Sequence, residues 1–450
     1  MVCRDSKNPA ARNCRDICAR QTGIGVGHTS EEAVMLLKEK RRESAILTIL
    51  LCRLAAGLLI LASLSARPGL ALVNSTSTAG SSGVEILSTD LPAGCVSGSY
   101  AAQPPKQFDP RYLICMPTTK PWNGDLVLFA HGYVSPIEAG PVIIDYTIGN
   151  GMTVSQIITG LGYAFATTSF RSNGLVIPQA VDDIVALVSL FQSIEKSSPQ
   201  HTYLVGASEG GLVTALAIEK YPQMLTGGLA TCGPCGDFRR QIDYLGDFLV
   251  VFNYFFPGVL GSSTPGAIPD YVIANWDSYT LAVGNALSDT KATQQLLRVT
   301  GASIDPEDPS SIAATVLGVL WYDVFATNDA VAKLGGPPFD NRLRWYSGSD
   351  NDLLLNRKIA RFTASPQALS NISKSYQTSG RLSRPVVTLH TTGDPIIPYW
   401  QEPLYSLKVL LSGSALRHVN VPIFDYGHCN FTQQELLTAF SILRTMVALQ

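Results

Sequence analysis

The chain has almost no net charge and few charged side chains, which argues against partners that require a strongly charged surface. Its 450 residues include 33 Lys+Arg and 35 Asp+Glu, which gives a formal net charge of −2, and only 15% of the residues are charged. Nucleic-acid-binding proteins present a basic surface, so nothing in this composition indicates a nucleic-acid partner. With 46% hydrophobic residues, the chain has enough apolar material for a large buried core.

The N-terminal part lacks an apolar run long enough to span a membrane. Residues 45–64 are mostly apolar, but Arg53 interrupts them, and the longer remaining piece is too short for a hydrocarbon core of roughly 30 Å. A basic cluster at 38–42 precedes this stretch, and Gly69-Leu-Ala71 follows it as a small-x-small cleavage site. Residues 1–71 are therefore predicted to be the signal peptide of a secreted or periplasmic protein, with membrane contact only if this leader stays uncleaved.

The rest of the chain shows no internal repeat, but it does show an alternating pattern. Residues 72–109 are expected to form a linker and N-terminal segment, because 74–90 are rich in Ser, Thr and Gly. From residue 110, short apolar runs alternate with amphipathic stretches, which is typical of βαβ units and a parallel sheet. The alternation stops over 236–383 and then returns. The sequence thus predicts an α/β core in two parts, 110–235 and 384–450, separated by a large lid or cap insertion.

Individual elements follow from the same pattern. Strands are expected over 125–130, 163–170, 202–206, 227–231, 385–390 and 419–424, and helices over 153–161, 177–194, 210–221 and 433–449.

The strongest local motif is Gly206-Ala-Ser208-Glu-Gly210, which has the form GxSxG. It lies between a predicted strand and a predicted helix. Such a turn strains the serine backbone and exposes its hydroxyl, while the two glycines remove side chains that would clash. The helix N-terminus adds unpaired N–H groups near the developing negative charge. Ser208 is therefore the candidate nucleophile.

A serine hydroxyl needs a base, and five histidines follow the leader. His428 is the preferred base, because it lies in a loop between the last predicted strand and the last helix. His201, His390 and His418 lie within or at the start of strands and are interpreted as structural. His131 belongs to a loop after the strand 125–130.

The base needs an acid to orient it, and the oxyanion needs hydrogen-bond donors. Asp394 follows the strand 385–390 and so lies at the carboxyl edge of the sheet, where open α/β folds bind their ligands. Asp425 is expected to shape its own loop, and Asp270 is a weaker candidate. The expected oxyanion donors are the backbone N–H groups of Glu209 and of Tyr133, in His131-Gly-Tyr133.

These motifs, in the chain order Ser208, Asp394, His428, resemble those of the α/β-hydrolase superfamily. The sequence looks like the secreted bacterial esterase and lipase-like branch. The resemblance covers about 110–235 and 384–450, and it implies an eight-stranded, mostly parallel sheet, an acyl-enzyme mechanism, and no metal or cofactor. The oxyanion loop lacks the Gly-rich run of some lipases, and the insertion matches no known pattern.

The leading functional hypothesis is a carboxylic-ester hydrolase acting on a small-molecule, lipid or polymer ester. One alternative is a peptidase of the prolyl-oligopeptidase type, although no propeller-like repeat precedes the core. The other is a non-catalytic binding module, although no member of the triad is missing.

Five cysteines follow the leader, and export permits disulfides. Cys95 and Cys115 are the preferred pair. Cys232-Gly-Pro-Cys235 has CxxC spacing but lacks the context of a redox or zinc motif, so a structural role is expected. Cys429 is either free or paired with Cys232 or Cys235, which would tie the base of the insertion to the loop that carries His428.

The insertion contains an unusually aromatic segment, 243–257. This segment is interpreted mainly as the core of the insertion, with an apolar wall for an acyl chain as the functional alternative.

Overall fold

The computed structural model describes residues 83–85, 91–148 and 151–450. The signal peptide predicted over 1–71 lies outside the described residues, as does most of the Ser/Thr/Gly-rich stretch 74–90.

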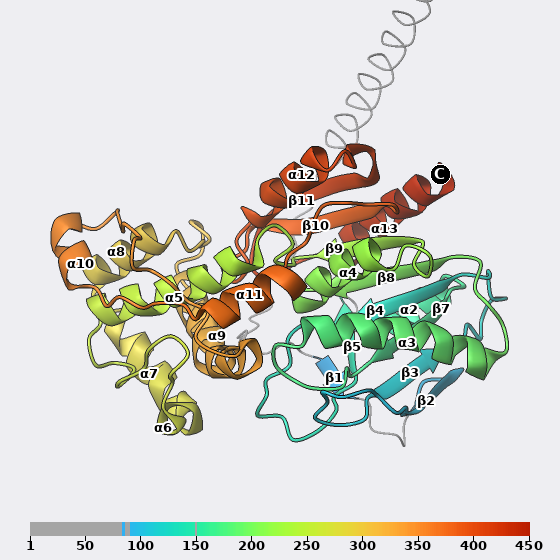
Figure 1. Cartoon of the computed structure of the whole chain (residues 1–450), viewed down its shortest axis with the longest axis horizontal. Helices are drawn as coiled ribbons and strands as arrows, with labels where there is room; N and C mark the ends of the chain where they lie inside the picture. Colours follow the sequence, from blue (N-terminus) through green and yellow to red (C-terminus); the bar gives the residue numbers. More distant parts are fainter. Residues whose placement is uncertain (1–82, 86–90, 149–150) are drawn as a thin grey trace, which may run out of the picture. The chain divides into compact units, whose positions relative to one another are not determined.

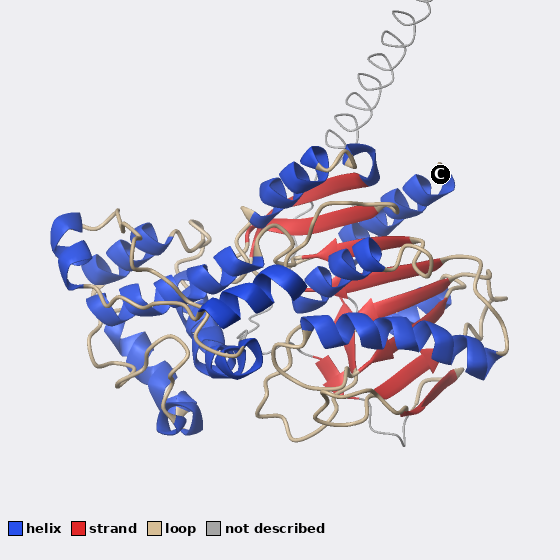
Figure 2. Ribbon diagram, in the orientation of Figure 1, coloured by secondary structure: helices blue, strands red, loops and turns tan. Residues whose placement is uncertain are grey.

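The centre of the fold is an eight-stranded sheet that is parallel except at one edge (Figures 1 and 2). Its strands run in the order β11-β10-β9-β8-β4-β7-β3-β2. β3 is antiparallel to β2 and β7, and the other neighbouring pairs are parallel. The bounds are β2 Cys95–Ser99, β3 Arg111–Cys115, β4 Leu126–Ala130, β7 Ala164–Thr168, β8 Thr202–Ala207, β9 Gly227–Thr231, β10 Val386–Gly393 and β11 His418–Tyr426. The predicted fold class, a mostly parallel eight-stranded sheet flanked by helices, is confirmed.

Helices cover both faces of this sheet, which explains the uniformly apolar strands at its centre. α3 (Ile177–Glu195) and α4 (Glu209–Lys220) lie on one face, and α2 (Val154–Gly160) and α13 (Gln433–Ala448) on the other (Figure 1). Near one edge, α12 (Gln401–Leu411) packs on β11. All ten side chains of β4 and β7 are buried, as expected for strands covered on both sides.

The segment between β9 and β10 forms helices with a core of their own. They are α5 Phe238–Phe255, α6 Asp270–Ala274, α7 Trp276–Ala286, α8 Thr290–Thr300, α9 Ser311–Leu334, α10 Asp352–Lys358 and α11 Pro366–Ser375. α5 carries the aromatic segment noted in the sequence. Its Phe248, Leu249 and Phe252 are fully buried against side chains of α9 such as Val319 and Leu320. The aromatic residues of α5 therefore build the core of the insertion.

Two smaller features complete the described chain. A three-stranded antiparallel sheet consists of β1 (Gly83–Glu85), β5 (Ile144–Ile148) and β6 (Met152–Thr153). A short 3-10 helix, η2 (Ala415–Arg417), precedes β11.

A buried ion pair holds the loop between β7 and α3. The Nε and the backbone N–H of Arg171 each donate to a carboxylate oxygen of Asp183 over 2.8 Å. Asp183 is fully buried and Arg171 nearly so. The loop ends at Val176, whose N–H donates to the side chain of Glu209 beside Ser208. The ion pair thus supports the turn that carries the candidate nucleophile.

We predict that Arg171→Met lowers the free energy of unfolding by about 3–5 kcal/mol, because it leaves the buried Asp183 carboxylate without its cation. Urea denaturation measures the loss. The double variant Arg171→Met/Asp183→Leu should recover part of it, since an apolar pair replaces the charges. Lys220→Met, which breaks the exposed pair with Asp182, is the control and should cost less than about 1 kcal/mol. If Arg171→Met lowered the free energy of unfolding by no more than Lys220→Met does, the prediction would be contradicted.

Candidate active site

Ser208 lies on the sharp turn between β8 and α4. Its backbone has φ 58° and ψ −121°, a region that residues with a side chain rarely occupy. A Cβ atom at Gly206 would collide with the carbonyl oxygen of Gly210, and one at Gly210 would collide with that of Ala130. Both glycines of the motif are therefore required by close backbone packing. The Ser208 N–H donates to the carbonyl of Thr231 on β9 over 2.9 Å, which fixes the turn to the sheet.

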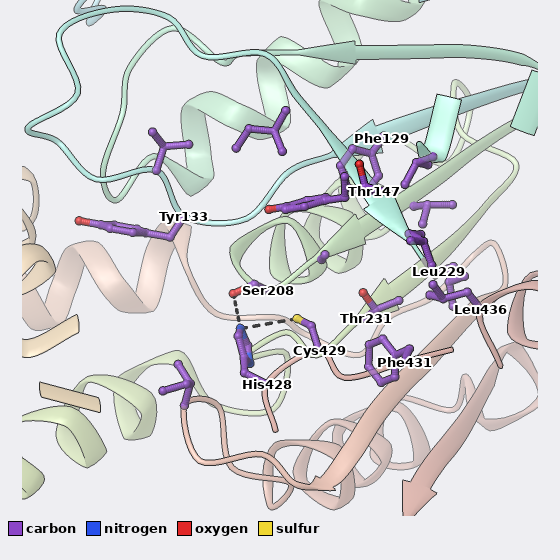
Figure 3. Close-up of a pocket in the computed structure, with 18 of the residues that line it drawn as sticks. Phe129, Tyr133, Thr147, Ser208, Leu229, Thr231, His428, Cys429, Phe431 and Leu436 are labelled. Atoms are coloured by element: carbon purple, nitrogen blue, oxygen red, sulfur yellow. Dashed lines mark hydrogen bonds between the residues drawn. The ribbon is translucent and has the colours of Figure 1, made fainter. Parts of the chain in front are cut away.

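The structure brings Ser208, His428 and Asp394 together. The Nε2 of His428 lies 2.8 Å from the Ser208 Oγ (Figure 3), and its Nδ1 lies 2.7 Å from Asp394 Oδ2. Asp394 directly follows β10, and His428 follows β11, so all three residues come from the carboxyl edge of the sheet. With Nδ1 donating to the carboxylate, Nε2 is left as the acceptor of a hydrogen bond from the Ser208 hydroxyl.

Asp394 is fully buried and held in its charged form. Its Oδ1 accepts the N–H groups of Ile396 at 2.8 Å and Ile397 at 3.0 Å. Burial by itself would raise the pKa of this carboxyl, but His428 and His390 outweigh it and lower the pKa to about 2. The carboxylate is therefore ionised throughout the range in which an imidazole titrates.

His390 is a second partner of Asp394 that the sequence did not indicate. Its position within a predicted strand indicates a structural role. In the structure its Nε2 lies 3.3 Å from Asp394 Oδ2, and its Nδ1 lies 2.9 Å from Glu402 Oε1. Burial lowers the pKa of His390, but the two carboxylates prevail and raise it to about 10. The buried His390 is thus an imidazolium held between two carboxylates; its spacing of four residues from Asp394 is the only signal in the sequence.

The three other described histidines form hydrogen bonds with residues other than Ser208. His201 Nδ1 lies 2.8 Å from Asp125, and His418 Nε2 lies 3.1 Å from Thr388 Oγ1. His131 Nδ1 donates to the Gly132 carbonyl over 2.7 Å. Its ring packs on Phe170 with centroids 4.1 Å apart. Burial lowers the pKa of His131 to about 4, so this histidine is neutral and shapes the loop before Tyr133.

The two weaker acid candidates do not contact His428. Asp425 is exposed and accepts the N–H of the next residue, Tyr426. Asp270 begins α6 in the insertion.

The backbone N–H groups of the loop after β4 and of the residue after Ser208 differ in whether they have an acceptor. The N–H of Gly132 donates to the Tyr146 hydroxyl over 3.3 Å. Within the described part of the chain, the N–H groups of the two predicted donors, Tyr133 and Glu209, have no hydrogen-bond acceptor. Tyr133 and Ser208 line the same cavity (Figure 3), and the Tyr133 hydroxyl donates to the carbonyl of Phe325 in α9 over 3.1 Å.

The side chain of Glu209 contacts the start of α3. It is buried, and its Oε1 accepts the N–H of Val176, the N-cap residue of α3, over 3.0 Å. Burial raises the pKa of Glu209 to about 7, and the hydrogen bond from Val176 opposes this rise only in part. Glu209 therefore joins the elbow helix α4 to the start of α3.

Two disulfides link the described cysteines. Cys95 and Cys115 are paired across β2 and β3, with Cα atoms 3.9 Å apart. Cys232, after β9, is joined to Cys429, which follows His428, with Cα atoms 5.3 Å apart. Cys235 is a buried thiol outside both described bonds. The second disulfide ties the loop of the candidate base to the start of the insertion.

Cys232, His428 and Cys429 also place one potential ligand atom each within 4.8 Å of one another. A cysteine binds a metal as a thiolate. Because the two sulfurs are joined here, the cluster offers no thiolate for a metal ion.

A cavity of about 840 Å³ adjoins Ser208 and His428 (Figure 3). The insertion contributes Gly318, Trp321 and Tyr322 of α9 to its wall. Burial raises the pKa of Tyr322 above its usual value. Among the described residues, α5 contributes nothing to this wall. The sequence did not identify Tyr322, because its distance from Ser208 depends on how the insertion packs.

The strand order, the strand–serine–helix turn and the chain order Ser208, Asp394, His428 define the fold as that of the α/β hydrolases.

No protein-family model and no curated protein sequence matches the chain. Among solved structures, feruloyl esterase B from Aspergillus oryzae is similar over 78% of this chain and 79% of its own, at 16% identity and a TM-score of 0.41. Acylaminoacyl peptidase from Pyrococcus horikoshii is similar over 74% of this chain and 37% of its own, at 12% identity and a TM-score of 0.39. The chain thus spans less than two fifths of that peptidase. Est1E from Butyrivibrio proteoclasticus is similar over 79% of this chain and 98% of its own, at 12% identity and a TM-score of 0.37.

We predict that Cys232→Ser, Cys429→Ser and the double variant each lower the free energy of unfolding by the same amount, about 2–5 kcal/mol. The losses should be equal because each change breaks the same bond. Urea denaturation under non-reducing conditions measures them. Losses that add in the double variant, or a Cys429→Ser variant as stable and active as the wild type, would contradict the pairing.

The buried carboxyl of Glu209 predicts a pH-dependent stability. Its pKa is about 7 in the folded state against an ordinary value of 4.5. Its stabilising contribution is therefore complete below pH about 4.5 and is lost as the pH rises through about 7. Relative to Glu209→Gln, the wild type should lose on the order of 3 kcal/mol between pH 4 and pH 8. Denaturation across this range measures the difference, and Glu307→Gln at an exposed site controls for the lost charge. A difference in the free energy of unfolding between wild type and Glu209→Gln that stays constant from pH 4 to pH 8 would contradict this prediction.

Proposed function

We propose that the protein is a serine hydrolase that cleaves carboxylic esters through an acyl-enzyme intermediate. The observation that carries this proposal is the continuous hydrogen-bonded series Asp394, His428, Ser208 beside an apolar cavity. A serine with this backbone strain and a base at 2.8 Å has the geometry of an activated nucleophile.

The proposed first step is attack of the Ser208 Oγ on the ester carbonyl carbon, while His428 Nε2 takes the hydroxyl proton. Asp394 holds the Nδ1–H tautomer and stabilises the imidazolium that forms. The tetrahedral intermediate then collapses, and His428 returns the proton to the departing alcohol. Water repeats the sequence on the acyl-enzyme and releases the acid.

The negative charge of the intermediate needs donors that are already in place. The N–H groups of Tyr133 and Glu209 are proposed for this role, because neither has an acceptor among the described residues. The Tyr322 side chain lines the same cavity as Ser208 and would contact the substrate there.

In the proposed reaction, side chains, backbone N–H groups and water carry out the chemistry. The proposed substrate is an apolar small-molecule, lipid or polymer ester. The two disulfides support a place of action in an oxidising compartment, outside the cell or in the periplasm. The helical segment between β9 and β10 is proposed to act as a cap, because α9 forms part of the cavity wall.

We predict that the purified protein hydrolyses p-nitrophenyl esters and that Ser208→Ala lowers kcat by several orders of magnitude, because it removes the activated nucleophile. The release of p-nitrophenolate measures the rate. Ser262→Ala, in the insertion, is the matched control and should retain wild-type activity. Peptide anilides should be cleaved far more slowly than esters.

Three other outcomes would each redirect the proposal. Faster cleavage of peptide anilides would favour the peptidase. Equal activity of wild type and Ser208→Ala would reject Ser208 as the nucleophile. No hydrolysis of either substrate class by a folded protein would favour a binding module.

A further inference from the structure

The cavity beside Ser208 extends back along one face of the central sheet. Val205 and Ala207 lie on β8, near the middle of the sheet, yet both are only half-buried, whereas their neighbour Leu204 is fully buried. Val205, Ala207 and Leu229 of β9 line the cavity together with Phe129 of β4. The open space therefore lies over the sheet itself, on the face that α2 and α13 cover (Figure 1).

The first turns of α13 form the opposite wall. Leu436 and Leu437 line the cavity and are half-buried, whereas Ala439 and Phe440 are buried. Phe440 packs edge-on against Tyr163 and Tyr203, with ring centroids 5.7 and 5.3 Å apart. The helix is thus buried against the sheet at Phe440, which also borders the cavity, while Leu436 and Leu437 in its first turns remain half-buried there.

The walls of this space are suited to an apolar ligand. They consist mainly of aliphatic and aromatic side chains (Figure 3). The hydroxyl of Thr231, which also faces it, already donates to the Gly206 carbonyl over 3.0 Å. A volume of about 840 Å³ lies within the range of pockets that bury small-molecule ligands.

We infer that the part of the cavity lined by Phe129, Val205, Leu229 and Leu436, the sheet-face pocket, binds the aliphatic acyl chain of the substrate. The inference rests on the proposed function. Of the two halves of an ester, the alcohol must leave before water attacks, whereas the acyl group stays bonded to Ser208. A pocket behind the nucleophile and beneath a helix suits the half that stays. Substrates are then esters of medium-chain aliphatic acids.

The first experiment measures kcat/KM for p-nitrophenyl esters from acetate to octanoate. In the wild type, kcat/KM should rise about threefold to fourfold per added methylene, which corresponds to about 0.8 kcal/mol per buried CH₂. Leu436→Trp fills the pocket and should lower kcat/KM for octanoate by at least about tenfold, with acetate changed less than about twofold. Leu436→Ala should instead favour decanoate and laurate over octanoate. Leu411→Trp, at an exposed position on α12, is the control.

Two results would overturn the inference while the proposed function stands. One is a flat acyl-length profile, or one that Leu436→Trp does not change. The other is a set of alkyl acetates, from ethyl to octyl, whose hydrolysis rises with chain length and falls in Leu436→Trp, since the pocket would then hold the alcohol.

A second measurement does not depend on catalysis. Calorimetry of decanoate with Ser208→Ala should show binding, and the added Leu436→Trp change should weaken it at least about tenfold. If the wild type cleaves no ester but this binding is seen, the proposed function fails and the sheet-face pocket stands. If decanoate does not bind, and esters are cleaved without regard to acyl length, the pocket is rejected.

Discussion

The site depends on close backbone packing where β8 meets α4. A Cβ atom at Gly211 would lie 2.6 Å from the Thr231 carbonyl oxygen, and the neighbouring Gly206 and Gly210 tolerate none either. These contacts press the helix N-terminus against β4 and β9. The chain can then reach α4 only through the strained conformation of Ser208, and this conformation directs the hydroxyl towards His428. Arg171 and Glu209 act on the same turn from the other side, through the start of α3.

Asp394, the residue that orients towards His428, lies in a network of buried charged groups. Asp394 accepts two backbone N–H groups and lies between the two imidazoles, His428 and His390. Glu402 on α12 contacts the far side of His390. A carboxylate in this setting is fully partnered, so its orientation towards His428 is set by the fold. Removing a single member of such a network leaves a buried charge without a partner, which is the costly case for buried ions.

The sequence predicted the main-chain framework of the site, because that framework depends on local patterns. The apolar runs of β4, β7 and β9, the GxSxG turn and the loops after β10 and β11 can each be recognised within a few residues. The predicted strands do not include β2 or β3. β2 is an edge strand, Cys-Val-Ser-Gly-Ser, whose side chains are half-buried or exposed, and the first two side chains of β3 are only half-buried. The contacts of His390 and Tyr322 depend on packing between distant segments, which composition and spacing do not reveal.

The disulfide between Cys232 and Cys429 spans 197 residues and encloses the whole helical segment between β9 and β10. A protease that cuts one exposed loop in this segment would produce two fragments that remain covalently joined. Ser208 would stay on the N-terminal fragment, and Asp394 and His428 on the C-terminal one. The bond next to His428 would keep the two halves of the site together. A protein with this arrangement can be cut within the helical segment and still hold Ser208 and His428 in one molecule.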